Sequence, residues 1–294
     1  MKRTIIVSNP FHLSLKRGQM VFRGAADGSD AGSVPVEDVG MVIVENPEVL
    51  VTMPLLSALA ERNAAVVFCD SRRLPSSLLV SLDANAKQGG TRIAQRAAKV
   101  TLKKGLWKQV VVAKIRNQAG LLDRLGFDGS VLKPYWSNVR SGDAGNMEAV
   151  AAKVYWGVLF GDGFSRSREG VVPNHFLNYG YTVLRSAMAR ALLGSGLSLD
   201  DGLFHRNCYN AMPLVDDMVE PFRPYVDGVV YEMYRSGCRE LGADEKRRLV
   251  AVGNEKVEFA DRSCSLTDAL SVASASLARV YLGAGDALGF PRIE

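Results

Sequence analysis

The spacing of hydrophobic and polar positions changes about one third of the way along the chain. In the first part, short runs rich in β-branched residues are separated by turn residues, a pattern that predicts strands joined by tight turns. The expected strands lie at residues 4–8, in a hairpin at 11–22 with its turn at Lys16, Arg17 and Gly18, and at 34–44, 65–69 and 77–82. Among them, Thr52 can cap a helix that has Pro54 in its first turn and runs to about Asn63.

From Gly89 onward the apolar residues recur with helical spacing. Thr91 can cap a helix that continues past Lys103, and Gly194 and Gly196 predict the end of a later one. Further helices are expected at 144–160, 174–193, 213–234 and 266–282. The sequence therefore predicts an α+β protein, with a small N-terminal β-rich domain at 1–90 and a larger all-α domain at 91–294.

The composition fits a globular protein that works in the cytoplasm. Of the 294 residues, 47% are hydrophobic and 23% are charged, and the net charge of +5 hints at an anionic partner. The N-terminus lacks the apolar core of a secretory signal, and no run is long enough for a membrane span. The four cysteines form no CxxC pair, which argues against a zinc ribbon and favours free thiols in a reducing compartment.

A basic stretch lies at the predicted domain boundary. Between Asp83 and Asp123 there are nine Lys or Arg residues and no acidic residue. On one continuous helix, four of these would form a single stripe: Arg92, Arg96, Lys99 and Lys103. A solvated helix face is the ordinary alternative, but such faces usually interleave both signs of charge. The stripe therefore predicts contacts with a nucleic-acid backbone, which carry no sequence specificity.

Two carboxylates and one imidazole are candidates for metal chemistry. Glu148 lies on an otherwise apolar helix face, His205 is one of three histidines, and Glu220 follows Asp216 and Asp217 by one helical turn. Such a set of ligands suits Mg²⁺ or Mn²⁺, which can polarise a phosphoryl oxygen and activate a hydroxyl nucleophile. Taken one at a time, each of these residues is also compatible with a purely structural role.

A polar stripe on the helix expected at 174–193 is a further candidate. Asn174, Asn178, Tyr181 and Arg185 share one face, where Asn and Tyr can hold carboxylate or phosphate oxygens, although an exposed surface is the ordinary interpretation. Tyr179 and Tyr181 also raise the question of a covalent tyrosine nucleophile. No adjacent base is evident to activate one, so direct transesterification is favoured, with Arg206 and Arg223 stabilising the developing negative charge.

The order of these motifs resembles the CRISPR-associated integrase/endonuclease family, the catalytic subunit of the spacer-acquisition complex, in its type II form. The resemblance rests on the helix with Glu148 and on four segments: SNPFHLSLK at 8–16, NYGY at 178–181, LFHRNCYN at 203–210 and DDMVEPFRP at 216–224. It implies a β-domain followed by a helical catalytic domain. It places the metal ligands on Glu148, His205 and Glu220, with Asp217 as a supporting acid.

The resemblance also implies a biological role and partners. The chain would join the 3′-hydroxyl ends of foreign DNA fragments to CRISPR repeat DNA. It would form a homodimer, with the β-rich domain expected to dimerise, and two dimers would flank a dimer of a small ferredoxin-like adaptation subunit in a heterohexamer. In type II systems the effector nuclease is a further implied partner.

Other functions stay open on the residues alone. A stand-alone structure-specific DNA nuclease would use the same metal to activate water, and nothing in the sequence separates water from a DNA 3′-hydroxyl as the nucleophile. A non-catalytic DNA-binding scaffold would need no metal. A small-molecule metalloenzyme would leave the basic stretch unexplained.

Overall fold

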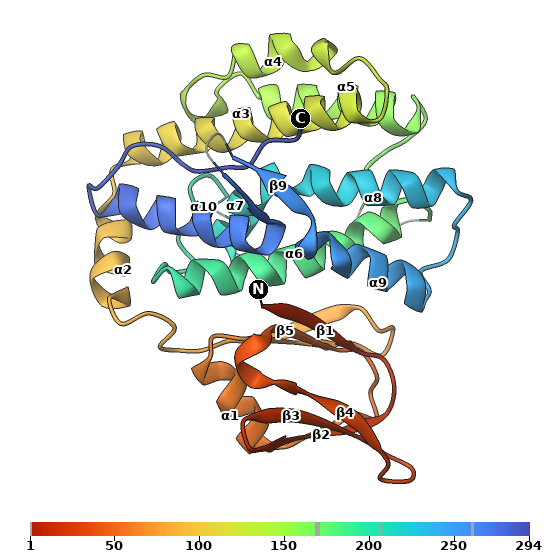
Figure 1. The fold of residues 1–294 in the computed structure, drawn as a ribbon. Helices are drawn as coiled ribbons and strands as arrows, with labels where there is room; N and C mark the ends of the chain where they lie inside the picture. The colour runs from red at the N-terminus through yellow and green to blue at the C-terminus, as the bar shows by residue number, and fades with distance from the viewer. Residues whose placement is uncertain (1, 168–170, 206, 260–261) are drawn as a thin grey trace. The chain divides into compact units, whose positions relative to one another are not determined.

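The computed structural model describes residues 2–167, 171–205, 207–259 and 262–294 (Figure 1). The chain divides into two compact units, Met1–Ala84 and Asn85–Glu294. Strands dominate the first unit and helices the second, so the predicted α+β class is confirmed. The division falls a few residues before the expected boundary at residue 90, because the first helix of the second unit already begins at Gln88.

The first unit contains two four-stranded sheets and one helix. One sheet has the order β1-β5-β7-β8 and the other the order β4-β3-β2-β6. The strands are β1 (Arg3–Val7), β2 (Phe11–Lys16), β3 (Gln19–Gly24), β4 (Asp30–Pro35), β5 (Val39–Val44), β6 (Leu50–Val51), β7 (Ala65–Cys69) and β8 (Pro75–Leu79). In the first sheet β1, β5 and β7 are parallel, whereas β8 pairs antiparallel with β7. The helix α1 (Met53–Glu61) follows β6.

Local sequence explains the elements of this unit. The hairpin of β2 and β3 is confirmed, and its two turn residues, Arg17 (φ 49°) and Gly18 (φ 74°), both adopt the positive φ of a tight hairpin turn. β5 is buried along its whole length between two neighbouring strands, which is why it reads as a continuous apolar run. α1 begins after Thr52, as expected, and buries Leu55 and Leu59.

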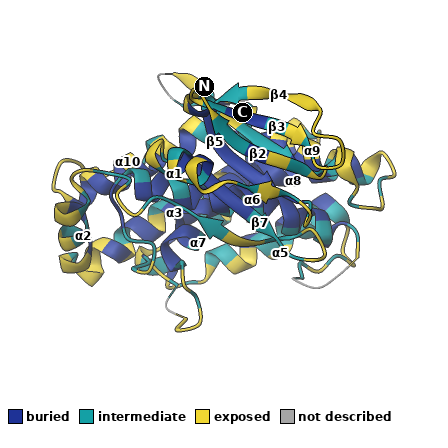
Figure 2. Cartoon of the chain, turned by 90° about the horizontal axis from the view of Figure 1, so that it is seen from below, coloured by how far each residue is buried: buried dark blue, intermediate teal, exposed yellow. Residues whose placement is uncertain are grey.

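The second unit is a helical assembly around α6. Its helices are α2 (Gln88–Ala97), α3 (Val100–Arg124), α4 (Lys133–Ser137), α5 (Met147–Phe160), α6 (Asn174–Gly194), α7 (Pro213–Val219), α8 (Arg223–Arg235), α9 (Ala243–Ala251) and α10 (Leu266–Tyr281). Helices α7, α8, α9 and α10 contact α6, while α3 contacts α5 and α8. In Figure 2 the buried positions gather on α6 and α7, whereas α2 is mostly exposed.

Three sequence expectations for this unit need correction. Thr91 does not cap a helix, because α2 already begins at Gln88 and the Thr91 side chain is buried. The helix does not run past Lys103 unbroken, since Ala98 and Lys99 are extended (ψ 128° and 145°) and separate α2 from α3. The unit is also not all-α, because β9 (Lys256–Glu258) and β10 (Ser263–Ser265) form a small antiparallel sheet.

The later helices follow the predicted pattern more closely. α6 and α10 lie where they are expected, and Gly196 (φ 78°) follows the end of α6. The helix predicted at 213–234 is interrupted by a 3-10 turn, Glu220–Phe222, between α7 and α8. Pro221 and Pro224 remove two backbone N–H donors from this joint, so a regular helix cannot continue through it. No described helix is long and apolar enough to cross a membrane.

Candidate functional site

Glu148 and Glu220 converge on one cation, the ammonium group of Lys114. Glu148 comes from the first turn of α5, Glu220 from the 3-10 turn, and Lys114 from the middle of α3. Lys114 Nζ lies 2.7 Å from Glu148 Oε1 and 2.6 Å from Glu220 Oε2. Arg223 Nη2 lies 3.0 Å from the other oxygen of Glu220, Oε1. Two carboxylates distant in sequence therefore enclose one positive charge.

The electrostatics of this cluster keep Lys114 and Glu220 charged. Burial lowers the pKa of Lys114, but the carboxylates of Glu220 and Glu148 outweigh burial, and the net pKa is raised. Burial raises the pKa of Glu220, yet Arg223 and Lys114 outweigh it and hold that pKa below its ordinary value. A buried carboxylate is stable only when it is paired in this way. The cluster thus keeps the Glu220 carboxylate ionised at neutral pH.

The start of α5 fixes the position of Glu148. Asp143 precedes the helix, and its carboxylate accepts hydrogen bonds from the backbone N–H groups of Met147 (2.9 Å) and Glu148 (3.0 Å). These are two of the N–H groups that lack partners within a helix, so Asp143 acts as the cap. Glu148 is therefore held at a defined point of the first turn, from which its side chain reaches Lys114.

A buried carboxylate organises the segment that carries His205. Asp217, on α7, is fully buried and accepts hydrogen bonds from the backbone N–H groups of Leu203 (2.6 Å) and Phe204 (3.0 Å). Its other oxygen lies 2.6 Å from His205 Nδ1. This hydrogen bond to Asp217, opposed by burial, raises the pKa of His205. Because Nδ1 is engaged, Nε2 is the ring nitrogen left for a ligand.

An aromatic stack packs α3 against the segment that carries His205. Trp107 of α3 is fully buried and stacks on Phe204, with ring centroids 4.7 Å apart. The His205 ring lies edge-on to Trp107, at 5.8 Å. Such contacts limit the rotation of the imidazole and hold it in one orientation.

His205 and Glu220 line one pocket of about 650 Å³. Its wall is polar and basic, and its lining residues are Arg166, Asn178, Tyr181, Thr182, Arg185, His205, Asn207, Tyr209, Asn210, Asp216, Val219, Glu220 and Arg223. Three members of the polar stripe predicted on α6 are among them. Tyr179 is not among them, because it lies on the buried side of α6, where Lys246 contacts its ring.

Side chains around the pocket are linked by hydrogen bonds and ion pairs. Arg166 Nη2 donates to Asn178 Oδ1 (2.7 Å), and Arg185 pairs with Asp216 (2.6 Å). The guanidinium groups of Arg166 and Arg223 both lie over the ring of Tyr181, at 5.1 and 4.7 Å from its centroid. The pocket therefore presents several arginines held in fixed orientations, an arrangement suited to phosphate oxygens.

A buried acid lies behind this wall. Asp227 of α8 accepts hydrogen bonds from the hydroxyl groups of Tyr155 (2.8 Å) and Tyr181. Burial raises the pKa of Asp227 to about 7, although both tyrosine hydroxyls oppose the shift. Burial and the Asp227 charge raise the pKa of Tyr181 well above its ordinary value, so this phenol stays protonated.

The raised pKa of Asp227 predicts a pH-dependent effect of Asp227→Asn on stability. The folded protein holds the proton more tightly than the unfolded chain, so the stability contributed by Asp227 is lost as pH rises from about 4 to about 7. Asparagine keeps the shape and stays neutral. We expect the Tm of Asp227→Asn, relative to wild type, to rise with pH across this range. A Tm difference that stays constant from pH 4.5 to 7.5 would contradict this account.

The residues predicted to contact DNA differ in how far they are exposed to solvent. Arg96 and Lys99 are exposed, whereas Arg92 is half-buried and donates to Gln88 (3.0 Å). Lys103 is buried and forms an ion pair with Asp201. Because α2 and α3 are separate helices, these four residues form no single stripe. Arg223 lines the pocket, and Arg206 lies outside the described residues.

The residues present fit a metal ion by their chemistry. The carboxyl groups of Glu148 and Glu220 already pair with one cation between them, and the His205 ring is held by a buried acid. Histidine ligands are commonly oriented by such a carboxylate. In the described part of the chain, however, no three His, Cys, Asp or Glu residues stand close enough to hold a metal ion together. The Lys114 ammonium occupies the position between the two glutamates, so a metal bound there would replace it.

Several residues of the site are not predicted individually by the sequence. Lys114 is only one member of the basic stretch, and Asp143, Arg166 and Asp227 belong to none of the predicted sites. Asp143 carried a usable signal, because an acidic residue just before a predicted helix is a candidate cap. For Arg166 and Asp227 the sequence held no such signal, since their roles depend on contacts across the fold.

Comparison with known proteins identifies the family. The family described as "CRISPR associated protein Cas1" matches residues 4–240. The chain belongs to the CRISPR-associated Cas1 family. A CRISPR-associated endonuclease Cas1 of Neisseria meningitidis serogroup C (strain 8013) is 40% identical over 237 residues, which cover 80% of this chain and 77% of that relative. A second Cas1 relative, from Pyrobaculum aerophilum, is 29% identical over 78% of this chain and 81% of its own length.

Solved Cas1-like structures share the fold. A casposase bound to integration product superimposes with a TM-score of 0.81 at 19% identity, covering 98% of this chain and 92% of that one. The Cas1 protein of Thermotoga maritima has a TM-score of 0.75 at 14% identity, covering 96% and 97%. A Cas6-RT-Cas1–Cas2 complex contains a chain with a TM-score of 0.74 at 16% identity, covering 97% of this chain and 35% of that one. At these identities the likeness concerns the fold alone.

Proposed function

We propose that this Cas1-family chain is a metal-dependent DNA integrase and endonuclease that joins the 3′-hydroxyl ends of foreign DNA fragments to CRISPR repeat DNA. The observation that carries the proposal is the convergence of Glu148 and Glu220 on one cation beside an arginine-rich pocket that His205 also lines. The Neisseria relative is named an endonuclease, which supports a nuclease role. The casposase of similar fold is bound to integration product, which supports an integrase role.

Glu148, Glu220 and His205 would hold Mg²⁺ or Mn²⁺. When bound, the ion would polarise the target phosphate and increase the acidity of the attacking hydroxyl. Asp217 would keep the His205 ring in the tautomer that leaves Nε2 for a ligand. Arg223 would keep Glu220 ionised through their ion pair.

The pocket arginines would bind the reacting DNA strands. Arg166, Arg185 and Arg223 present donors that can bind phosphate oxygens and stabilise negative charge as it develops. Asn178 and Asp216 hold two of these side chains in place. The reaction is direct transesterification, in which the oxygen of the DNA 3′-hydroxyl forms a bond to phosphorus while the bond to the leaving 3′-oxygen breaks.

A covalent tyrosine intermediate fits the site poorly. The hydroxyl of Tyr181 donates to Asp227, and its pKa is raised well above the ordinary value by burial and by that charge. A phenol in this state is a weak nucleophile. Tyr179 lies in the core, away from the pocket. Tyr181→Phe is therefore expected to retain joining at a reduced rate.

We propose that the chain works as a homodimer within an adaptation complex that contains the small ferredoxin-like subunit. Support comes from the Cas6-RT-Cas1–Cas2 complex, in which a chain of the same fold is found. A heterohexamer with two flanking dimers, dimerisation through the β-rich unit, and contact with a type II effector nuclease belong to the same proposal.

A joining assay tests this function. The purified chain, its small partner subunit, a DNA fragment and repeat DNA should yield a joined product only with Mg²⁺ or Mn²⁺ and a free 3′-hydroxyl. Cleavage by water with no joining would favour the alternative of a stand-alone structure-specific nuclease. Metal-independent DNA binding without any reaction would favour a scaffold, and a labelled strand trapped on the protein would point to covalent catalysis.

We expect the contribution of the basic stretch to DNA affinity to come from its exposed residues. Arg96→Ala and Lys99→Ala are expected to reduce the slope of log K against log salt by about 0.9 for each lost phosphate contact. Lys103→Ala is the matched comparison, because its ammonium is buried against Asp201. This variant should lower Tm and leave the salt slope unchanged. Equal slopes in all three variants and in wild type would show that this region does not contact DNA.

A further inference from the structure

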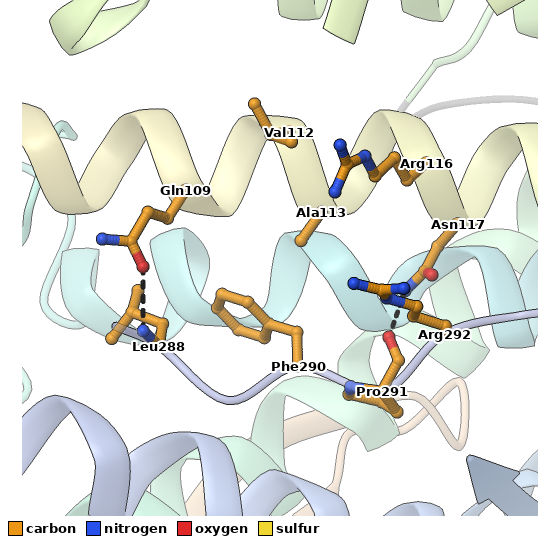
Figure 3. A pocket seen from close by; sticks show the side chains of 9 residues that line it. All are labelled: Gln109, Val112, Ala113, Arg116, Asn117, Leu288, Phe290, Pro291 and Arg292. Atoms are coloured by element: carbon orange, nitrogen blue, oxygen red, sulfur yellow. Dashed lines mark hydrogen bonds between the residues drawn. The ribbon is translucent and has the colours of Figure 1, made fainter. Parts of the chain in front are cut away.

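The C-terminal segment 284–294 returns along α3 and reaches the turn that carries Glu220. It follows α10 and is held to α3 at two points (Figure 3). At the first point, Gln109 Nε2 donates to the carbonyl of Asp286 (3.0 Å), and the N–H of Leu288 donates to Gln109 Oε1 (2.8 Å). A groove of about 220 Å³ lies between helix and segment from Gln109 to Asn117. The segment is also bonded to α10, where the N–H of Gly289 donates to Ser276 Oγ (2.9 Å), and to β9, where the N–H of Arg292 donates to the carbonyl of Glu258 (2.8 Å).

Asn117 forms the second point and also contacts the candidate site. This buried side chain donates from Nδ2 to the carbonyl of Pro291 (3.1 Å) and accepts at Oδ1 from the N–H of Ile293 (3.2 Å). Nδ2 donates as well to the carbonyl of Pro221 (2.7 Å), the residue directly after Glu220. Both amide hydrogens and the amide oxygen are therefore used, and one side chain joins three segments of the chain.

Two further contacts bring the C-terminal segment to the same place. A Cβ atom on Gly120 would lie 2.1 Å from the carbonyl oxygen of Ile293, so only glycine permits this close approach of the backbones. The Phe290 ring packs edge-on against Phe222 of the 3-10 turn, with centroids 6.0 Å apart. The segment thus supports the turn directly through Phe222 and indirectly through Asn117.

We propose that Asn117 is a positioning residue through which the C-terminal segment fixes Glu220 for metal binding. Pro221 and Pro224 deprive the turn of two N–H donors, so its geometry depends on partners outside the helix. Asn117 follows Lys114 by just under one turn of α3, so one helix carries both the ammonium that pairs with Glu220 and the amide that binds the Pro221 carbonyl. This inference rests on the proposed function, because it assumes that Glu220 is a metal ligand.

The test compares two variants that each lose side-chain hydrogen bonds to the C-terminal segment. Calorimetric titration of the full-length protein with Mn²⁺ is expected to show at least tenfold weaker binding by Asn117→Ala than by wild type. Gln109→Ala loses both of its bonds to the same segment but has no hydrogen bond to the turn, and it should bind Mn²⁺ within twofold of wild type. Wild-type affinity in folded Asn117→Ala, or an equal loss in Gln109→Ala, would overturn the proposal.

A third variant, Gly120→Ala, tests the proposal if Asn117→Ala does not fold. Gly120→Ala leaves the amide of Asn117 intact and moves the C-terminal segment away from it, so Mn²⁺ binding should weaken severalfold while circular dichroism stays native. Unchanged binding would again overturn the proposal. The proposed function fails separately: wild-type Mn²⁺ affinity in Glu220→Ala would show that Glu220 is no ligand, whatever Asn117 does.

Discussion

Replacing His205 with alanine is expected to lower the rate of DNA joining by at least about a thousandfold while DNA affinity changes little. The imidazole is the one neutral ligand of the proposed metal set, and the structure commits its Nδ1 to Asp217. Its removal takes away a ligand without removing any arginine that lines the pocket. The measurement is single-turnover joining with Mn²⁺, alongside fluorescence anisotropy for DNA binding.

A histidine outside the site gives the matched control. His12 is exposed on β2 in the other unit, so His12→Ala should join DNA at the wild-type rate. A His205→Ala protein that still joins DNA within tenfold of wild type would remove the imidazole from the mechanism. Weakened DNA binding that fully accounts for the lost rate would instead assign His205 to substrate binding.

The parts of the fold set by local sequence could be predicted. The turn at Arg17 and Gly18, the helix after Thr52 and the end of α6 each depend on a few neighbouring residues, and all three are confirmed. The break between α2 and α3 depends on tertiary contacts instead. Gln95 lies just before the break and is fully buried, donating to the carbonyls of Ser198 and Asp201 (both 3.0 Å). Such distant partners leave no trace in the periodicity of residues 91–103.

The candidate site likewise has parts that the sequence predicts and parts that depend on tertiary contacts. The resemblance brought Glu148, His205 and Glu220 together as a proposal, and the structure places His205 and Glu220 on one pocket and both glutamates on Lys114. Of the partners that orient them, Asp143 has a local signal as an acid just before a predicted helix, whereas Asn117 cannot be ranked from sequence, because a buried amide and a solvated one look alike along the chain. Contacts with segments more than 100 residues away decide the role of Asn117, as in its bond to Pro221.

Replacing Lys114 with methionine is expected to destabilise the metal-free protein by about 3 kcal/mol, because it leaves two glutamates close together without the cation they share. Methionine keeps most of the side-chain volume, so the loss is electrostatic rather than a cavity effect. Lys108→Met is the matched control, since Lys108 is exposed on the same helix. It should change the free energy of unfolding by less than about 0.5 kcal/mol. Urea unfolding in EDTA measures both.

Mn²⁺ should raise the Tm of Lys114→Met by more than it raises the Tm of wild type. In wild type, an ion that binds between Glu148 and Glu220 must first displace the ammonium, whereas in the variant the carboxylates are free to accept it. Binding to the folded state alone raises stability by RT ln(1 + [L]/Kd), so the Tm increase on adding Mn²⁺ should be larger for the variant. An equal or smaller increase would show that the metal does not take the place of Lys114. Unchanged stability of Lys114→Met in EDTA would show that the ion pairs of Lys114 with Glu148 and Glu220 contribute nothing to the free energy of unfolding.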